Sequence, residues 1–267
     1  MENLCNLFFE ISNEDRIKML HEIEREPLTL TNISRKLNLP SSETHRQLTR
    51  LNDVNLIHKN NDGFFNLTPY GRQVLFWIPG FKFMVDNNEF FKNHVLSGIP
   101  NNLLSRLGDL SINEFSDDAL VTVSHIESMI INAESYIQNI HDQFLLNAYP
   151  LASEAVQRGV SIRSIDPVVY NPSLQIKGEI GEDIEKVLSD ALVDGRVINR
   201  QLEKFDVFLW MSEKEVAILS FPKIDGKFDY HGFISKDKKF HDWCSDLFNY
   251  YWEKAQPKNE LSLARPY

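Results

Sequence analysis

Apolar residues recur three and four positions apart over much of the N-terminal part of the chain, which is the spacing of an amphipathic helix. On this basis helices are expected at residues 1–10, 14–26, 31–37 and 42–52. Pro27 ends the second of them, and Ser41 is suited to the N-cap of the fourth. Because only a short turn at 38–41 joins the third helix to the fourth, the pair is typical of a helix–turn–helix.

A β-hairpin is predicted directly after the fourth helix. Short strands are expected at residues 56–59 and 64–67, separated by the turn sequence Asn-Asn-Asp-Gly. Thr68 is placed to cap a further helix that begins at Pro69 and runs to Trp77. This order of elements is that of a winged helix-turn-helix, and it assigns residues 1–78 to such a domain.

The rest of the chain divides into a helical segment and an alternating region. Residues 79–118 are rich in Phe, and an apolar helical linker of this kind either packs on a neighbouring domain or pairs with a second chain. From 119 to 256 helices and strands alternate and hairpins follow, which predicts an α/β domain with a mixed sheet. The expected fold class is therefore α+β, and the tail 257–267 is expected to be unstructured.

The elements expected in the alternating region can be stated as ranges. Helices are predicted at 121–133, 150–158, 182–191 and 238–255, and strands at 160–165, 195–203, 205–211, 216–221 and 230–234. A further strand lies within 136–146, and residues 168–181 form a loose stretch.

Composition narrows the classes of function. The 267 residues include 28 Lys and Arg against 38 Asp and Glu, a net charge of −10, which argues against a protein that coats nucleic acid irrespective of sequence. No stretch approaches the ~20 apolar residues of a membrane span, and the first ten residues have no basic residue to begin a signal peptide. Cys5 and Cys244 are far apart, as in reduced thiols of a cytoplasmic protein.

The negative charge is distributed unevenly along the chain. Residues 1–78 hold nine basic and ten acidic residues, whereas the remainder holds 19 and 28. Within residues 33–50 there are four basic residues and one acidic residue, Glu43. A local excess of +3 therefore coincides with the predicted helix–turn–helix, which favours double-stranded DNA as a partner.

The outer face of the fourth helix is the expected DNA-reading surface, since the second helix of this motif lies in the major groove. Arg46 is expected to contact a guanine or to anchor a phosphate, and Glu43 either accepts from cytosine N4 or faces solvent. The expected DNA contacts are Arg35, Lys36, Ser41, Ser42, Glu43, His45, Arg46, Thr49, Arg50 and Lys59. Of these, Arg35, Lys36, Thr49 and Arg50 are expected at the phosphate backbone.

Three groups of residues resemble known regulators. Leu28-Thr29, Ile33, Leu37, Leu39, Arg46, Leu48, Leu51 and Leu56-Ile57 follow the rhythm of ArsR/MarR-like regulators. The stretches FFKNHVLSGIP (90–100) and FHDWCSDLFNYYW (240–252) resemble an archaeal family named for the control of filamentation and methanogenesis. AVQRGVSIRSID (155–166) is similar to the phospholipase-D-like sensor domain of archaeal sugar-responsive regulators.

These resemblances imply a DNA-binding transcription regulator with a C-terminal domain that senses a signal or pairs subunits. A homodimer is expected as well, because one short helix gives limited affinity and two-fold symmetry doubles the contacts. An adaptor whose winged helix docks on a transcription factor is the alternative from another class.

Catalysis and metal binding are not expected. Phospholipase-D chemistry needs a His nucleophile with Lys two residues on, and none of the eight His has one. The chain also lacks GxSxG, P-loop and GxGxxG motifs. The enzymatic alternative that remains is a cryptic phosphodiesterase, whose catalytic residues would not be visible as a sequence motif. His241 and Cys244 stand three apart on a helix, but two ligands do not form a site, and no cofactor is expected.

A pocket for a small-molecule effector is a further expectation for the C-terminal domain. Its candidate residues lie in the predicted sheet: Arg163, Arg196, Arg200, Trp210 and Tyr230. Arginines on strands suit an anionic small molecule such as a carboxylate, or they pair with nearby acids on the surface. The aromatic last helix either fills the core or in part contacts another subunit.

Overall fold

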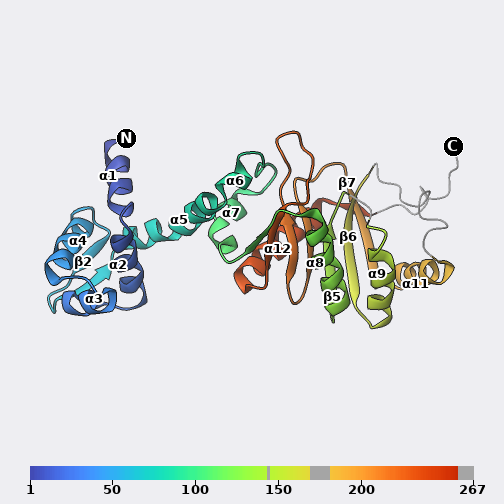
Figure 1. Cartoon of the computed structure of the whole chain (residues 1–267), viewed down its shortest axis with the longest axis horizontal. Coiled ribbons are helices and arrows are strands. Elements are labelled where there is room, and N and C mark those ends of the chain that lie inside the picture. Colours follow the sequence, from blue (N-terminus) through green and yellow to red (C-terminus); the bar gives the residue numbers. More distant parts are fainter. Residues whose placement is uncertain (143–144, 169–180, 258–267) are drawn as a thin grey trace. The chain divides into compact units, whose positions relative to one another are not determined.

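The computed structural model describes residues 1–142, 145–168 and 181–257, and these form two compact units, one up to Phe81 and one from Lys82 onward (Figure 1). The loose stretch expected at 168–181 and the tail after 257 fall almost wholly outside the described residues. The fold class is confirmed as mixed α and β, with helices and a small sheet in the first unit and a large mixed sheet in the second.

The first unit is a winged helix. Its helices are α1 (Glu2–Ile11), α2 (Glu14–Arg25), α3 (Leu30–Leu37), α4 (Ser41–Asp53) and the first part of α5 (Pro69–Asp86), and its strands are β1 (Leu28–Thr29), β2 (Ile57–Lys59) and β3 (Phe64–Leu67). The strands pair antiparallel in the order β1-β3-β2, with Ile57 opposite Leu67. The predicted order of helix, helix–turn–helix, hairpin and helix is therefore confirmed.

The turn between α3 and α4 differs in one detail from the prediction. Ser41 is the first residue of α4 and not its N-cap, because the carbonyl of Pro40 already accepts the backbone N–H of Thr44 at 2.9 Å. Asn38 ends α3 in the left-handed conformation, with φ at 52°, which Asn tolerates better than most residues. The turn is closed by the Ser34 hydroxyl, which donates to the carbonyl of Leu39 at 2.7 Å.

Helix α5 begins as expected and continues further than expected. The Thr68 hydroxyl accepts the backbone N–H of Gly71 at 2.8 Å, and a Cβ at Gly71 would lie 2.0 Å from the carbonyl oxygen of Leu56, so only glycine fits there. The predicted end at Trp77 is wrong, since the helix runs through Pro79 to Asp86. A proline inside a helix removes one hydrogen bond and need not end the helix when its flanks are held elsewhere.

The second unit is built on one mixed sheet. Its helical elements are α6 (Asn88–Phe91), α7 (Asn101–Leu104), η1 (Leu107–Leu110), α8 (Ala119–Asn132), α9 (Ala148–Gln157), α11 (Glu182–Val193) and α12 (Lys238–Lys254). Its strands are β4 (Glu114–Ser116), β5 (Tyr136–Ile140), β6 (Ser161–Pro167), β7 (Val197–Leu202), β8 (Phe208–Ser212), β9 (Val216–Ser220), β10 (Gly232–Ser235) and β11 (Gln256–Pro257). The order is β11-β7-β6-β5-β8-β9-β10-β4, with β5, β6 and β7 parallel and the remaining pairs antiparallel.

Helices cover both faces of this sheet. One core contains residues of α12, including the fully buried Trp243, and the other contains residues of α8 and α9. The first core also takes Phe83, Phe90, Ile99 and Leu103 from the segment expected to be a linker. From Lys82 onward that segment packs on the sheet, which is the first of the two alternatives that the sequence left open.

No helix among the described residues is both long and apolar enough to pass through a lipid bilayer.

Candidate nucleic-acid interface

The outer face of α4 is polar and open to solvent. The side chains exposed on it are those of Ser41, Ser42, His45, Arg46 and Thr49. The side chain of Arg46 is 67% exposed, while Leu48 and Leu51 on the inner face are fully buried. The structure therefore brings together, on one face, five of the residues expected to contact DNA.

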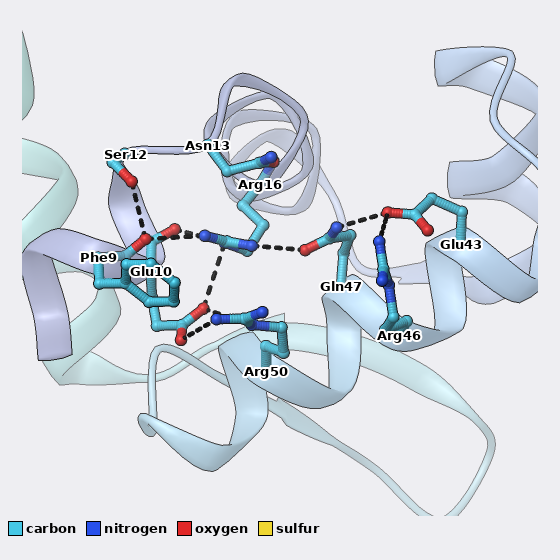
Figure 2. A network of polar contacts seen from close by, with 9 residues as sticks. All are labelled: Phe9, Glu10, Ser12, Asn13, Arg16, Glu43, Arg46, Gln47 and Arg50. Atoms are coloured by element: carbon cyan, nitrogen blue, oxygen red, sulfur yellow. Dashed lines mark hydrogen bonds and ion pairs between the residues drawn. The ribbon is translucent and has the colours of Figure 1, made fainter.

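Behind this face a buried arginine of α2 joins α1 to α4 (Figure 2). Only 5% of the Arg16 side chain is exposed. Its Nε and Nη2 donate to the carbonyls of Glu10 and Phe9 at 2.5 and 2.8 Å, and its Nη1 donates to Gln47 Oε1 at 2.7 Å. Since the last carbonyls of a helix lack partners within the helix, Arg16 completes the end of α1 and ties it to the inner face of α4.

The same end of α1 supplies the counter-ion of Arg50. The Nε and Nη2 of Arg50 donate to the two carboxylate oxygens of Glu10 at 2.9 and 2.7 Å, and its Cζ lies 5.0 Å from the centre of the Phe9 ring. The Arg50 hydrogen bond lowers the pKa of Glu10 from its usual 4.5, against the opposing effect of burial. This carboxylate therefore stabilises the fold above about pH 4.5 and loses that contribution as the pH falls through the lowered value.

Glu43 completes this group of contacts on the solvent side. Its Oε1 accepts from Arg46 Nη2 at 2.8 Å and from Gln47 Nε2 at 2.5 Å. The bond from Arg46, followed by that from Gln47, lowers the pKa of Glu43. Its carboxylate is thus engaged within its own helix and does not simply face solvent. We call the connected residues Glu10, Arg16, Glu43, Arg46, Gln47 and Arg50 the α1–α4 network (Figure 2).

The positive charge counted along the sequence is largely paired in the fold. Lys36 Nζ lies 3.2 and 2.8 Å from carboxylate oxygens of Glu22 and Glu26, both outside the window that gave the excess of +3. Arg50 pairs in the same way with Glu10 of α1. Two of the four bases are therefore neutralised by acids of α1, of α2 and of the residue that caps the C-terminus of α2. Arg35, by contrast, has no ion pair within 4.0 Å among the described residues, so the net charge of the surface is smaller than the sequence suggested.

The wing contributes one basic residue. Lys59 is exposed at the end of β2, with its Nζ 5.6 Å from the centre of the Phe65 ring. The turn is held by Asn60, whose Oδ1 accepts the backbone N–H groups of Asp62 and Phe64 at 3.1 and 2.8 Å. Lys59 therefore lies on a hairpin whose turn is closed by hydrogen bonds, and its contact with DNA stays a prediction.

Sequence reasoning overlooked Glu10, Arg16 and Gln47, although a signal for two of them existed. Arg16 falls on the same helical face as Met19, Leu20 and Ile23, which are buried. Likewise Gln47 shares the buried face of α4 with Leu48 and Leu51. A polar residue at a core position of an amphipathic helix predicts a buried hydrogen-bond partner. Glu10 carries no such signal, because its partner lies forty residues away.

The five residues expected at an effector site do not form one pocket. Arg163 and Arg200 place their Cζ atoms 5.6 and 4.4 Å from the centre of the Trp252 ring, on the α12 side of the sheet. Trp210 and Tyr230 belong to the core on the opposite side. Arg196 bonds Asp194 and the carbonyl of Val156, which is the surface pairing that the sequence left open as the alternative.

Trp210 and Tyr230 lie near a second group of polar residues. At the carboxyl ends of β5 and β6, His141 Nε2 lies 3.2 Å from Asp166, and the Tyr230 hydroxyl donates to Asp142 at 3.2 Å. Trp210 stacks on His141 at 5.5 Å, and its buried Nε1 has no hydrogen-bond partner among the described residues. Ligands of open α/β sheets commonly bind at the carboxyl ends of strands, so this is the place where an effector is best sought.

The remaining cysteine and histidine pair has ordinary contacts. Cys244 is fully buried, and burial raises the pKa of its thiol. His241 Nε2 lies 2.7 Å from the carbonyl oxygen of Ser212. Within the described ranges, no group of three or more His, Cys, Asp and Glu is arranged to hold a metal ion.

Comparison with known proteins adds no family. No protein-family model and no curated protein matches the chain. Among solved structures, TrmBL2, reported as an archaeal chromatin protein with a novel mode of DNA binding, is 18% identical over 87% of this chain and 88% of its own, with a TM-score of 0.44.

Two further solved structures match with lower TM-scores. The phospholipase D family member Nuc of Salmonella typhimurium is 14% identical over 55% of this chain and 96% of its own, with a TM-score of 0.37. The S-adenosylmethionine-dependent methyltransferase SibL is 15% identical over 73% and 62%, with a TM-score of 0.26. Identities and TM-scores this low assign neither a family nor an activity to the chain, so the family resemblances of its short motifs stay predictions.

Proposed function

We propose that this protein is a DNA-binding regulator that lays α4 in the major groove and acts as a homodimer. The observation that carries the proposal is the division of α4 into two faces. Its inner face is fixed by apolar packing and by the contacts of Gln47, while its outer face offers hydroxyl, imidazole and guanidinium groups to solvent. A helix with exposed donors and acceptors on one side suits the reading of base edges.

Replacing the most exposed arginine of this face tests the proposal. Arg46→Ala should weaken binding to duplexes selected from a random pool about tenfold, as expected for the loss of one base or phosphate contact worth ~1–3 kcal/mol. Fluorescence anisotropy at several salt concentrations measures both affinity and salt slope. Lys204→Ala, which removes an exposed charge from the second unit, is the matched control and should bind like the wild type. Unchanged binding by the Arg46 variant would contradict reading by α4.

An exposed apolar surface in the first unit supports the dimer. Phe8 and Phe9 of α1 and Trp77 and Phe81 of α5 are each 45–61% exposed. The rings of Phe8 and Phe81 meet edge to face at 6.2 Å, which makes the surfaces of the two helices continuous. Monomeric proteins rarely leave a large contiguous apolar patch uncovered, so we propose that a second copy of the chain covers this one.

Sedimentation velocity at micromolar concentration tests the proposed dimer. The wild type should sediment as a dimer, and Trp77→Glu should sediment as a monomer, because a carboxylate in an apolar interface loses its hydration without gaining a partner. The control Val193→Glu replaces an apolar side chain of the second unit that is 87% exposed, and it should leave the dimer intact. A wild-type monomer, or a dimer unaffected by Trp77→Glu, would refute this assignment.

Regulation through the second unit is part of the proposal. The polar group around His141, Asp166 and Trp210 would bind a small effector, and a ligand shifts DNA binding only if it prefers one of two states of the protein. Should the wild type bind no duplex at all, the adaptor alternative, in which the winged helix docks on another protein, would take its place.

A further inference from the structure

We propose that Glu10 and Arg16 are positioning residues of the DNA-reading surface, which withdraw the charge of Arg50 from the phosphate backbone and thereby favour sequence-dependent over sequence-independent binding. This inference rests on the proposed function. It assigns a role in reading DNA to a helix, α1, that precedes the helix–turn–helix.

The first step is that Arg50 is already committed. Two of its three nitrogens donate to both carboxylate oxygens of Glu10, and its guanidinium lies beside the Phe9 ring. Charge-assisted, two-pronged bonds of this kind are the strong ones among hydrogen bonds. To bind a phosphate, Arg50 would have to leave Glu10, whose side chain is only 12% exposed, without its main counter-ion.

The second step is that Glu10 cannot follow Arg50 outward. The backbone carbonyls of Phe9 and Glu10 are held by Arg16, which is itself fixed to Gln47 on the inner face of α4. The carboxylate also lies 3.3 Å from Arg16 Nε. Because these contacts are buried, the position of Glu10 is set by the fold, unlike the position of an exposed carboxylate on a flexible side chain.

The third step concerns what the pair does to binding. Each cation that neutralises a phosphate releases counter-ions from DNA, which steepens the dependence of affinity on salt by about 0.9 per contact. A guanidinium paired with Glu10 releases none. The affinity for a duplex of any sequence is thereby reduced. Arg46, by contrast, is 67% exposed on the outer face of α4 and donates to Glu43 of the same helix.

Glu10→Gln tests the inference, since it removes the charge but keeps an acceptor and the shape of the side chain. The variant should bind a duplex of random sequence about 3- to 10-fold more tightly, with a salt slope larger by about 0.9, and its preference for the selected site should fall. Glu14→Gln removes the same charge from an exposed position, 80% accessible and paired with Lys18, and should leave the slope unchanged. It separates a specific effect of Glu10 from a change in net charge.

Arg50→Ala provides a second, independent readout. In the wild-type background it should leave the salt slope unchanged, and in the Glu10→Gln background it should return the slope to the wild-type value. An unchanged slope in Glu10→Gln, or a reduced slope in Arg50→Ala alone, would overturn the inference. If the wild type binds DNA and Arg46→Ala weakens it, either of those results refutes this inference only, whereas a wild type that binds no DNA refutes the proposed function.

Discussion

Arg16→Met should lower the free energy of unfolding of the first unit by about 3–5 kcal/mol, the cost of removing one partner from a buried charged group. The variant keeps much of the side-chain volume but loses three donors. The carbonyl of Glu10, the Gln47 amide oxygen and part of the Glu10 carboxylate then lose a buried donor, while the carbonyl of Phe9 keeps only its bond from the Ser12 hydroxyl. Hydrogen exchange of the amides in α2 and α4 measures the loss within this unit.

The matched control for this substitution lies on the same helix. Lys18 pairs with Glu14 four residues earlier, and half of its side chain is exposed. Because surface ion pairs contribute only ~0–1 kcal/mol, Lys18→Met should change hydrogen exchange little. An Arg16 variant that loses no more protection than the Lys18 variant would show that the buried contacts do not hold the unit together.

In the second unit, His94→Ala should cost about 2–4 kcal/mol, because it removes a buried ring and one partner of the Asp229 carboxylate. His94 is 7% exposed and stacks on Phe90 at 3.8 Å. Its Nδ1 faces the Phe90 carbonyl at 2.8 Å, and its Nε2 lies 3.1 Å from both oxygens of Asp229. These contacts attach the segment after α6 to the loop between β9 and β10. Denaturant unfolding followed by intrinsic tryptophan fluorescence, in which Trp210, Trp243 and Trp252 report on the second unit, measures the loss.

The neighbouring histidine serves as the control. His231 has its Nδ1 3.6 Å from Asp229, a side chain 37% exposed, and a backbone N–H that would still bond Asp229 after replacement by Ala. His231→Ala should therefore cost less than ~1 kcal/mol.

Burial tends to raise the pKa of Asp229, but hydrogen bonds from His94 and from the His231 backbone hold it below the ordinary value. The stability that Asp229 adds is thus lost as the pH falls through the lowered pKa.

Equal losses of unfolding free energy in His94→Ala and His231→Ala would contradict the role given to His94.

Much of the fold could be predicted from the sequence, because many of its turns and helix starts depend on a few neighbouring residues. The hairpin turn Asn-Asn-Asp-Gly, the Thr68-Pro69 helix start and the apolar stripe of α4 each act over a few residues. The long helix α5 was missed because a proline usually stops a helix, and here packing on both sides of Pro79 overrides that preference. The short strands β4 and β11 were missed because only their partners in the sheet define them.

The candidate interface was predictable in its outline and not in its charge. The exposed face of α4 follows from helical periodicity. The partners of Lys36 and Arg50 come from α1, α2 and the residue after α2, which are far away in sequence. A count of charges along the chain therefore gave too large a positive excess for this surface, and its contact with DNA stays a prediction.

The contact of Arg16 with the end of α1 also decides where the smallest working fragment of this protein can begin. A fragment that starts at Asn13 would retain every residue of the helix–turn–helix and the wing. It would nevertheless lack the two carbonyls that Arg16 binds and the carboxylate that holds Arg50. A fragment cut to the helix–turn–helix and wing would thus be less stable and would carry an unpaired Arg50 on its surface. The shortest fragment that keeps these contacts includes the ten residues of α1.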